Sequence, residues 1–511
     1  MPQKIYNSIL KFIKIFYVHF GHFFPFHQIG IWLYTLAGFI CCKYLIYKIP
    51  EIQSIYQITN YHDNWFQPGI SDLDLLPVLK DAETKLELET IKKVNRARNL
   101  LGKIFPFVWL GGSPFFEIDF KFWYRINTDY IHHRQKYLEM KLIYGSEIRP
   151  NVIPIKKQKM SGSSLRFFYE EMLGNIYYNI LFQKNNYRIF YKFFKIYVQA
   201  GYTMEKTHQA PALESPQIQA WLAKTGCQKK FITKIINLKQ KKFFCSDSSF
   251  NIEIIYNLIK ITEYLTDIYK EKKKKLSVGR QIDTVKLKQG KKIPPFIEIS
   301  NFVKALPKDN IKSIVLTKNI LSSLLETFSF YIVYQTSNSF NFRKQIGSFL
   351  NNLHHLKNLM GNIKLQHRSA LFLTKNVFPI ILTEKILEFD TFVNADCFYE
   401  ALNINSNQLL LYGYPLKIKI NSHTVEKAWH FTINLALNSV PRPVFEALIM
   451  AILRNEILHQ NQKFDFSQNL AKLYESVFKE KKPDNFETFY CQTRNLIKNN
   501  YYSPYLKKYL P

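Results

Sequence analysis

Cysteine is scarce in this sequence, and its spacing matches no metal-binding or disulfide motif. There is no C-x-x-C, which argues against a zinc ribbon and against a disulfide framework. The cysteines are Cys41, Cys42, Cys227, Cys245, Cys397 and Cys491. Histidine offers no better metal site, because the neighbours in His132-His133 and His354-His355 would point about 100° apart on a helix. Such a chain suits a reducing compartment, so a cytoplasmic location is expected.

A long uninterrupted apolar run is also missing. The most apolar stretch, Ile29–Cys42, is broken by Lys43 before it reaches the roughly 18 to 20 residues that a membrane-spanning helix needs. Residues 1–28 space lysines among apolar side chains, like a signal sequence or an amphipathic helix, but no small-residue cleavage pattern follows. These features favour a buried helix over a membrane anchor, and association with a membrane is not expected.

Acidic residues are few relative to basic ones. The chain has 39 Asp and Glu against 70 Lys and Arg, a formal net charge of +31. A basic surface of this kind attracts polyanions such as RNA, nucleotides or anionic lipid. However, Lys, Asn, Ile, Phe and Tyr are abundant together while Gly and Ala are scarce. An AT-biased genome produces the same pattern without selection for RNA contact, so both interpretations stay open.

The length of 511 residues exceeds what one hydrophobic core usually serves, and 47% of the residues are hydrophobic. We expect a folded protein of several domains, with no repeat of 20–50 residues. The predicted segments are an α+β domain that includes the N-terminal helices (1–145), a helical domain (146–275), a basic linker or loop (276–297) and a C-terminal helical domain (298–511). The linker prediction rests on its lysine runs and on Pro294-Pro295.

Within the first segment the pattern predicts the order helix, strand, loop, strand, helix. A helix closes near Pro50, and apolar residues then alternate to residue 58 as a strand. Pro68-Gly69 punctuates a polar and aromatic loop, and Ser71–Leu79 alternates as a second strand. Apolar residues at helical spacing follow up to Leu101. The second strand carries the sharpest functional clue in the chain.

That clue is the pair of aspartates in "QPGISDLDLL", residues 67–76. Asp72 and Asp74 are two residues apart, so both carboxylates project from one face of a strand while Leu73 and Leu75 project from the other. Two carboxylates on one face can bridge a pair of Mg²⁺ ions that keep open positions for substrate phosphate. D-x-D also arises by chance, and a solvated turn is the plain alternative.

The longer stretch "IPEIQSIYQITNYHDNWFQPGISDLDLL" resembles the N-terminal catalytic motif of nucleotidyltransferases of the DNA polymerase β-like superfamily. It is most similar to bacterial proteins of the aminoglycoside nucleotidyltransferase kind. The resemblance covers roughly residues 29–145. It implies an α+β domain with a small mixed sheet, two Mg²⁺ ions held by Asp72 and Asp74, an NTP as donor and a hydroxyl acceptor.

The sequence departs from that motif in two places. Thr59-Asn60 stands where the family has Gly-Ser, so Thr59, Asn60 and Ser71 are the expected nucleotide-binding residues. The family's third catalytic carboxylate falls near Gly112 or Ser113, and Glu117 or Asp119 is the candidate substitute if the strand is shifted.

These departures keep two alternatives open. One is a catalytically degenerate nucleotidyltransferase fold that acts as a nucleotide- or RNA-binding module. The other is a glycosyltransferase, which also uses D-x-D, although only about seventy residues precede the motif.

Overall fold

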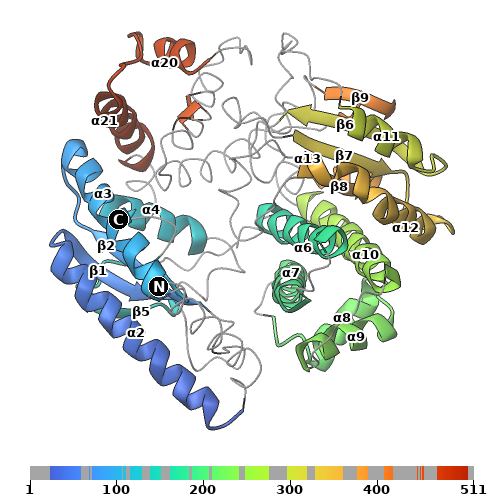
Figure 1. The fold of residues 1–511 in the computed structure, drawn as a ribbon, viewed down its shortest axis with the longest axis horizontal. Helices are drawn as coiled ribbons and strands as arrows, with labels where there is room; N and C mark the ends of the chain where they lie inside the picture. The colour runs from blue at the N-terminus through green and yellow to red at the C-terminus, as the bar shows by residue number, and fades with distance from the viewer. Residues whose placement is uncertain are drawn as a thin grey trace, which may run out of the picture. The chain divides into compact units, whose positions relative to one another are not determined.

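The computed structural model divides the chain into two compact units (Figure 1). The first comprises residues 1–157, 437–439 and 483–511, and the second comprises 158–436 and 440–482. The residues that the structure describes are 23–58, 68, 72–105, 107–110, 115–128, 138–150, 162–182, 187–206, 210–240, 248–274, 296–318, 328–360, 377–389, 408–417, 446, 449–450, 452–453 and 469–503.

This division differs from the segments expected from composition. The first unit extends to residue 157 rather than 145, and residues 483–511 belong to it although they close the chain. The two expected helical domains, 146–275 and 298–511, fall largely into one unit. The expected linker, 276–297, lies almost entirely outside the described residues.

The first unit is built on a small mixed sheet with the strand order β3-β2-β1-β5, and β4 pairs with the far end of β2. β1 runs antiparallel to β2 and to β5, whereas β2 runs parallel to β3 and β4. Its elements are α2 (Phe26–Lys48), β1 (Ile52–Gln57), β2 (Leu73–Leu79), α3 (Thr84–Ile104), β3 (Val108–Trp109), β4 (Phe115–Phe116), α4 (Glu117–Thr128), β5 (Lys141–Gly145), α21 (Phe486–Ile497) and the π-helical turn η3 (Lys498–Tyr502).

The core of this unit lies against one face of β1 and β2. Tyr56 stacks on Phe120 of α4 with ring centroids 5.1 Å apart. Leu76 and Val78 of β2 bury their side chains in the same cluster. On the other face of β2, Leu73 and Leu75 are also fully buried. β2 is therefore a central strand, and Asp74 is the one residue of this strand that is not buried.

The helix α2 buries one side and exposes the other. Tyr34 packs on Phe107 with ring centroids 4.4 Å apart, and the helix contacts β1, β2 and α3. Its exposed large apolar side chains are Ile29, Trp32, Leu33, Leu36, Phe39, Ile40 and Tyr47. The expected buried helix is thus only half-buried, and at 23 residues it is longer than the apolar run predicts. Among the described helices it alone is long and apolar enough to cross a membrane, a criterion that core helices and signal sequences also meet.

The second unit combines helices with a four-stranded sheet of order β8-β7-β6-β9. The sequence pattern predicted a mainly helical region for this part of the chain, which the helices bear out, but it did not predict the sheet. The elements are α6 (Gly162–Phe182), α7 (Tyr187–Lys206), α8 (Pro216–Lys224), α9 (Lys229–Gln240), α10 (Ser248–Lys274), α11 (Ile297–Ala305), β6 (Ile311–Lys318), β7 (Phe328–Tyr334), α12 (Phe342–Asn352), η2 (Leu353–Leu356), α13 (Lys357–Met360), β8 (Val377–Thr383), α15 (Glu384–Leu387), β9 (Gln408–Gly413) and α20 (Leu470–Phe478).

Side chains from the helices of this unit bind the backbone and the ends of its strands. The hydroxyl groups of Tyr169 and Tyr177 on α6 donate hydrogen bonds to the carbonyl oxygens of Ile381 and Pro379 in β8, at 2.6 Å and 3.1 Å. Thr383 at the end of β8 donates to the Glu263 carboxylate of α10 at 2.7 Å. β7 and β8 are buried on nearly every residue, so they read as continuous apolar runs, which periodicity alone cannot tell from a buried helix.

Candidate functional site

The two aspartates lie at the start of β2. The Leu73 amide donates to the carbonyl oxygen of Phe107 at 2.8 Å, which fixes the first residue of the strand. Asp74 lies opposite Trp109 in the parallel register with β3, and its carbonyl oxygen accepts from the Ile58 amide at 2.9 Å. Asp72 comes immediately before the strand and is exposed, whereas Asp74 is half-buried. The backbone around Asp74 is therefore held from both sides.

The side-chain alternation of a strand places Asp74 on the face that carries Leu76 and Val78. Leu76 and Val78 are fully buried in the core cluster, while Asp74 stands one step before it. A carboxylate there avoids the desolvation cost of the core and remains able to meet a cation. The position suits an oxygen ligand at the margin of a rigid strand.

Several expected site residues fall outside the part of the chain that the structure describes. These are the nucleotide-binding candidates Thr59, Asn60 and Ser71, and the positions Gly112 and Ser113 where a third carboxylate was sought. Their assignments remain predictions from the sequence.

The structure does not bring Glu117 and Asp119 to the aspartate pair. β4 joins β2 at its far end, where Phe116 lies opposite Leu79, and α4 begins with the next residue. Asp74 and Leu79 are about 17 Å apart along the strand at about 3.3 Å per residue. A carboxylate that completes a metal site with Asp74 must lie within a few ångströms of the same ion. Neither Glu117 nor Asp119 meets that requirement.

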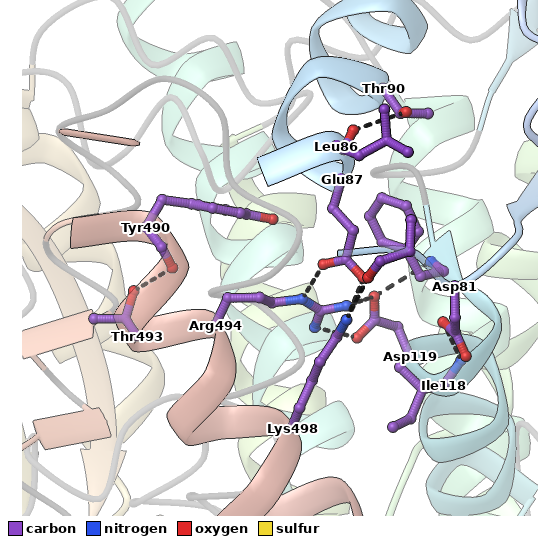
Figure 2. Close-up of polar contacts among 12 residues, drawn as sticks. Asp81, Leu86, Glu87, Thr90, Ile118, Asp119, Tyr490, Thr493, Arg494 and Lys498 are labelled. Atoms are coloured by element: carbon purple, nitrogen blue, oxygen red, sulfur yellow. Dashed lines mark hydrogen bonds and ion pairs between the residues drawn. The ribbon is translucent and has the colours of Figure 1, made fainter. Parts of the chain in front are cut away.

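Both residues have other partners. Glu117 pairs with Lys121 one turn along α4, at 2.5 Å. Asp119 accepts two hydrogen bonds from the guanidinium of Arg494, at 2.6 Å and 2.8 Å, and a third from the Phe116 amide at 3.2 Å (Figure 2). Because all three of these bonds go to its carboxylate, Asp119 is committed to holding α21 on α4. We assign it a structural role.

Arg494 is the centre of a buried ionic cluster that also contains Glu87 and Lys498 (Figure 2). Its Nε donates to Glu87 of α3 at 2.7 Å, and Glu87 also pairs with Lys498. Burial opposes the charge on Arg494, but Asp119 and Glu87 outweigh it and hold the pKa of the guanidinium well above its ordinary value. Nearby, burial raises the pKa of Asp81, whose carboxylate accepts from the Ile118 amide at 3.1 Å.

The helix that carries Arg494 has a clear local origin. The Asn485 side chain caps α21 by accepting from the Glu487 amide at 2.8 Å. Tyr490, Arg494 and Ile497 follow at helical spacing and are all buried. Nothing in the sequence near Arg494 identifies its partners, because they lie 407 and 375 positions earlier in the chain.

The chemistry open to the aspartate pair is that of hard cations. Among the residues that the structure describes, no three His, Cys, Asp or Glu side chains lie close enough together to hold one ion. A cation on Asp72 and Asp74 would complete its shell with water and substrate phosphate, as Mg²⁺ does at many phosphate-handling sites.

Comparisons with known proteins add no assignment. No protein-family model matches the chain, and neither the curated proteins nor the solved structures contain a match.

Proposed function

We propose that the first unit is a Mg²⁺-dependent nucleotidyltransferase that transfers a nucleoside monophosphate from an NTP to a hydroxyl acceptor. The observation that carries the proposal is that the exposed Asp72 lies immediately before a central strand and the half-buried Asp74 is the second residue of that strand. The small mixed sheet of the unit agrees with the α+β domain that the sequence motif implies.

In this reaction the acceptor oxygen attacks the α-phosphorus, a new P–O bond forms, and the bond to the leaving pyrophosphate breaks. Bound Mg²⁺ would neutralise the triphosphate and assist loss of the acceptor proton. Asp72 and Asp74 would hold and orient the cations, and the paired backbone on both sides of Asp74 would keep its carboxylate in position. Positioning and charge neutralisation would supply most of the rate gain.

The second candidate function is a nucleotide- or RNA-binding module without transferase activity. It is favoured by one observation: Glu117 and Asp119 lie at the opposite end of β2 from the pair, so neither supplies the third carboxylate. The net charge of +31 suits a polyanionic ligand. Salt-sensitive RNA binding that survives removal of both aspartates would support this candidate.

The test is calorimetric titration of the full chain with Mg²⁺ and a non-hydrolysable ATP analogue. Native protein should bind the analogue only with metal, and Asp72→Asn/Asp74→Asn should abolish that binding. Glu117→Gln is the matched control, since it removes a carboxylate of the same unit at the far end of β2 and should leave binding intact. Equal binding by native protein and the double variant would refute the transferase proposal.

A further inference from the structure

The two sheets of this protein have the same topology. In each, a helix leads into the first strand, β1 or β6. That strand pairs antiparallel with the next strand, β2 or β7, and with the last strand, β5 or β9. The second strand of each sheet pairs in parallel with a strand that follows a helical segment, β3 and β4 in the first unit and β8 in the second.

The irregularities of the two sheets also coincide. The first strand pair of each sheet shifts register two residues into the strand, between Ile52 and Ser54 in one and between Ile311 and Ser313 in the other. The pairing with the last strand shifts as well, and the residue that is skipped is Ile143 in one sheet and Leu411 in the other. Bulges are specific local features, so two at matched positions carry more weight than a shared strand order.

A glycine with positive φ ends the last strand in both cases. Gly145 has φ +84° and Gly413 has φ +75°. A Cβ atom on Gly145 would collide with the carbonyl oxygen of Gln53, and one on Gly413 would collide with that of Lys312. Both conditions, the left-handed backbone and the close approach, require glycine at the same place in each sheet.

A serine hydroxyl ties the first strand to the residue after that glycine. Ser54 donates to the carbonyl oxygen of Ser146, and Ser313 donates to that of Tyr414, both at 2.5 Å. The two serines are buried and lie directly opposite Gly145 and Gly413. The same side chain therefore makes the same long-range bond in both units.

The turns that enter and leave the first two strands match as well. The amide of Ile52 donates to the carbonyl oxygen three residues earlier at 3.1 Å, and the amide of Ile311 does so at 3.0 Å. After the second strand, Lys80 donates to Glu51 at 2.9 Å and Gln335 donates to Asn310 at 2.8 Å. Glu51 and Asn310 each stand immediately before the first strand.

A glutamate opens the helix that follows the parallel strand in each unit. Glu117 begins α4 directly after β4, and Glu384 begins α15 directly after β8. Glu117 bonds to Gln53 and Glu384 pairs with Lys312, and these partners occupy the same position of the first strand. The correspondence thus extends from backbone geometry to a side-chain contact.

We infer that residues 297–417 are a second copy of the fold formed by residues 26–148, and that metal-dependent chemistry is confined to the first copy. Short sequence matches fall where the geometry predicts them: "IQSI" corresponds to "IKSI" at 311–314, and "LIYG" at 142–145 corresponds to "LLYG" at 410–413. The acidic strand does not match. Ser329 corresponds to Asp74 by register: Ile52 pairs with Leu79 and Ile311 with Tyr334, and Asp74 and Ser329 each lie five residues before those partners.

The residue that corresponds to Asp72 is Thr327, obtained by counting back from Ser329 along the sequence, and it lies outside the described residues. The second copy therefore has two hydroxyl groups where the first has two carboxylates. Neutral hydroxyl groups bind Mg²⁺ far less well than carboxylates do, so this copy lacks the charge to hold the cations.

The repeat is tested first without reference to any activity. Gly145→Ala and Gly413→Ala should each lower the unfolding temperature by several degrees, because both force a side chain into a left-handed backbone and against a carbonyl oxygen. Gly102→Ala is the control, since a Cβ there meets nothing within 4 Å and the residue lies in a helix. Tolerance of alanine at either Gly145 or Gly413 would overturn the equivalence.

The second test counts Mn²⁺ sites by electron paramagnetic resonance, and this arm rests on the proposed function. Native protein should bind Mn²⁺ at the aspartate pair, Asp72→Asn/Asp74→Asn should lose it, and adding Thr327→Asp/Ser329→Asp should restore it. As a control, a D-x-D placed by Gln408→Asp/Leu410→Asp on the last strand of the second sheet should not restore Mn²⁺ binding. If native protein binds Mn²⁺ but the variant that carries Thr327→Asp/Ser329→Asp in place of the native pair does not, the inference is overturned. If the native chain binds no Mn²⁺, the proposed function fails and the glycine variants decide the repeat.

Discussion

Replacing Arg494 with methionine removes the cation at the centre of the buried cluster in the first unit. The guanidinium is 1% exposed and makes three hydrogen bonds to two carboxylates. In Arg494→Met, Glu87 keeps its pairing with Lys498, whereas Asp119 loses both guanidinium bonds and keeps the hydrogen bonds with the Phe116 amide and the Tyr502 side chain. Asp119 would then be a buried charge without a counter-ion.

Breaking a buried ion pair by removing one partner costs about 3 to 5 kcal/mol, because the remaining charge is left desolvated. We expect a loss of that size in Arg494→Met. The double variant Asp119→Asn/Arg494→Met should recover most of it, since the amide oxygen can still accept from Phe116 and no net charge is stranded. Glu117→Gln, which breaks the partly exposed pair with Lys121, should cost less than about 1 kcal/mol.

Hydrogen exchange measured by mass spectrometry is the suitable assay, because the two units need not unfold together. Peptides from α4 and α21 should exchange faster in Arg494→Met by about two to three and a half orders of magnitude. Peptides from the second sheet should not change. Exchange rates of α4 and α21 in Arg494→Met that stay within about tenfold of the native rates would refute the structural role of Asp119. Asp119 would then again be a candidate functional residue.

Two further predictions concern stability. Burial tends to raise the pKa of Glu205, but bonds from Tyr264, Lys224 and Trp221 lower it to about 2 from an ordinary 4.5. Its contribution, at most about 3 kcal/mol because solvent screens the exposed Lys224 partner, is therefore complete above the ordinary pKa and lost as pH falls toward about 2. Urea titrations should show that Glu205→Gln is most destabilising near neutral pH and converges on native protein in acid; a penalty independent of pH would contradict this. Phe120→Ala should cost about 3 to 5 kcal/mol, since the ring is fully buried and stacked on Tyr56. Phe340→Ala, at a ring that is 99% exposed, should be nearly neutral in the same denaturation, and similar penalties for both would disprove the packing argument.

The sequence alone was sufficient for the elements around the acidic strand. Alternation, helical spacing and Pro-Gly punctuation predicted a helix before Pro50, strands up to residue 58 and over 71–79, and a following helix up to Leu101. The structure has these four elements, with the strands at 52–57 and 73–79 and the last helix at 84–104. The expectation that Asp72 and Asp74 share one face came from the two-residue period of a strand, and in the structure Asp74 is in β2 while Asp72 lies immediately before it. These are properties of short segments, so they need no knowledge of what packs around them.

Only the tertiary structure decided the rest. It placed Asp119 against Arg494 and at the far end of β2 from Asp74, because a parallel register and a helix from the chain's end are set by contacts hundreds of positions apart. It also separated strands from helices in the second unit, where β7 and β8 are buried on both faces and lose the alternation that identifies a strand. The matched glycines of the two sheets became meaningful in the same way. Gly145 and Gly413 are unremarkable in the sequence, and their shared role depends on a backbone conformation and a neighbouring carbonyl that only the folded chain provides.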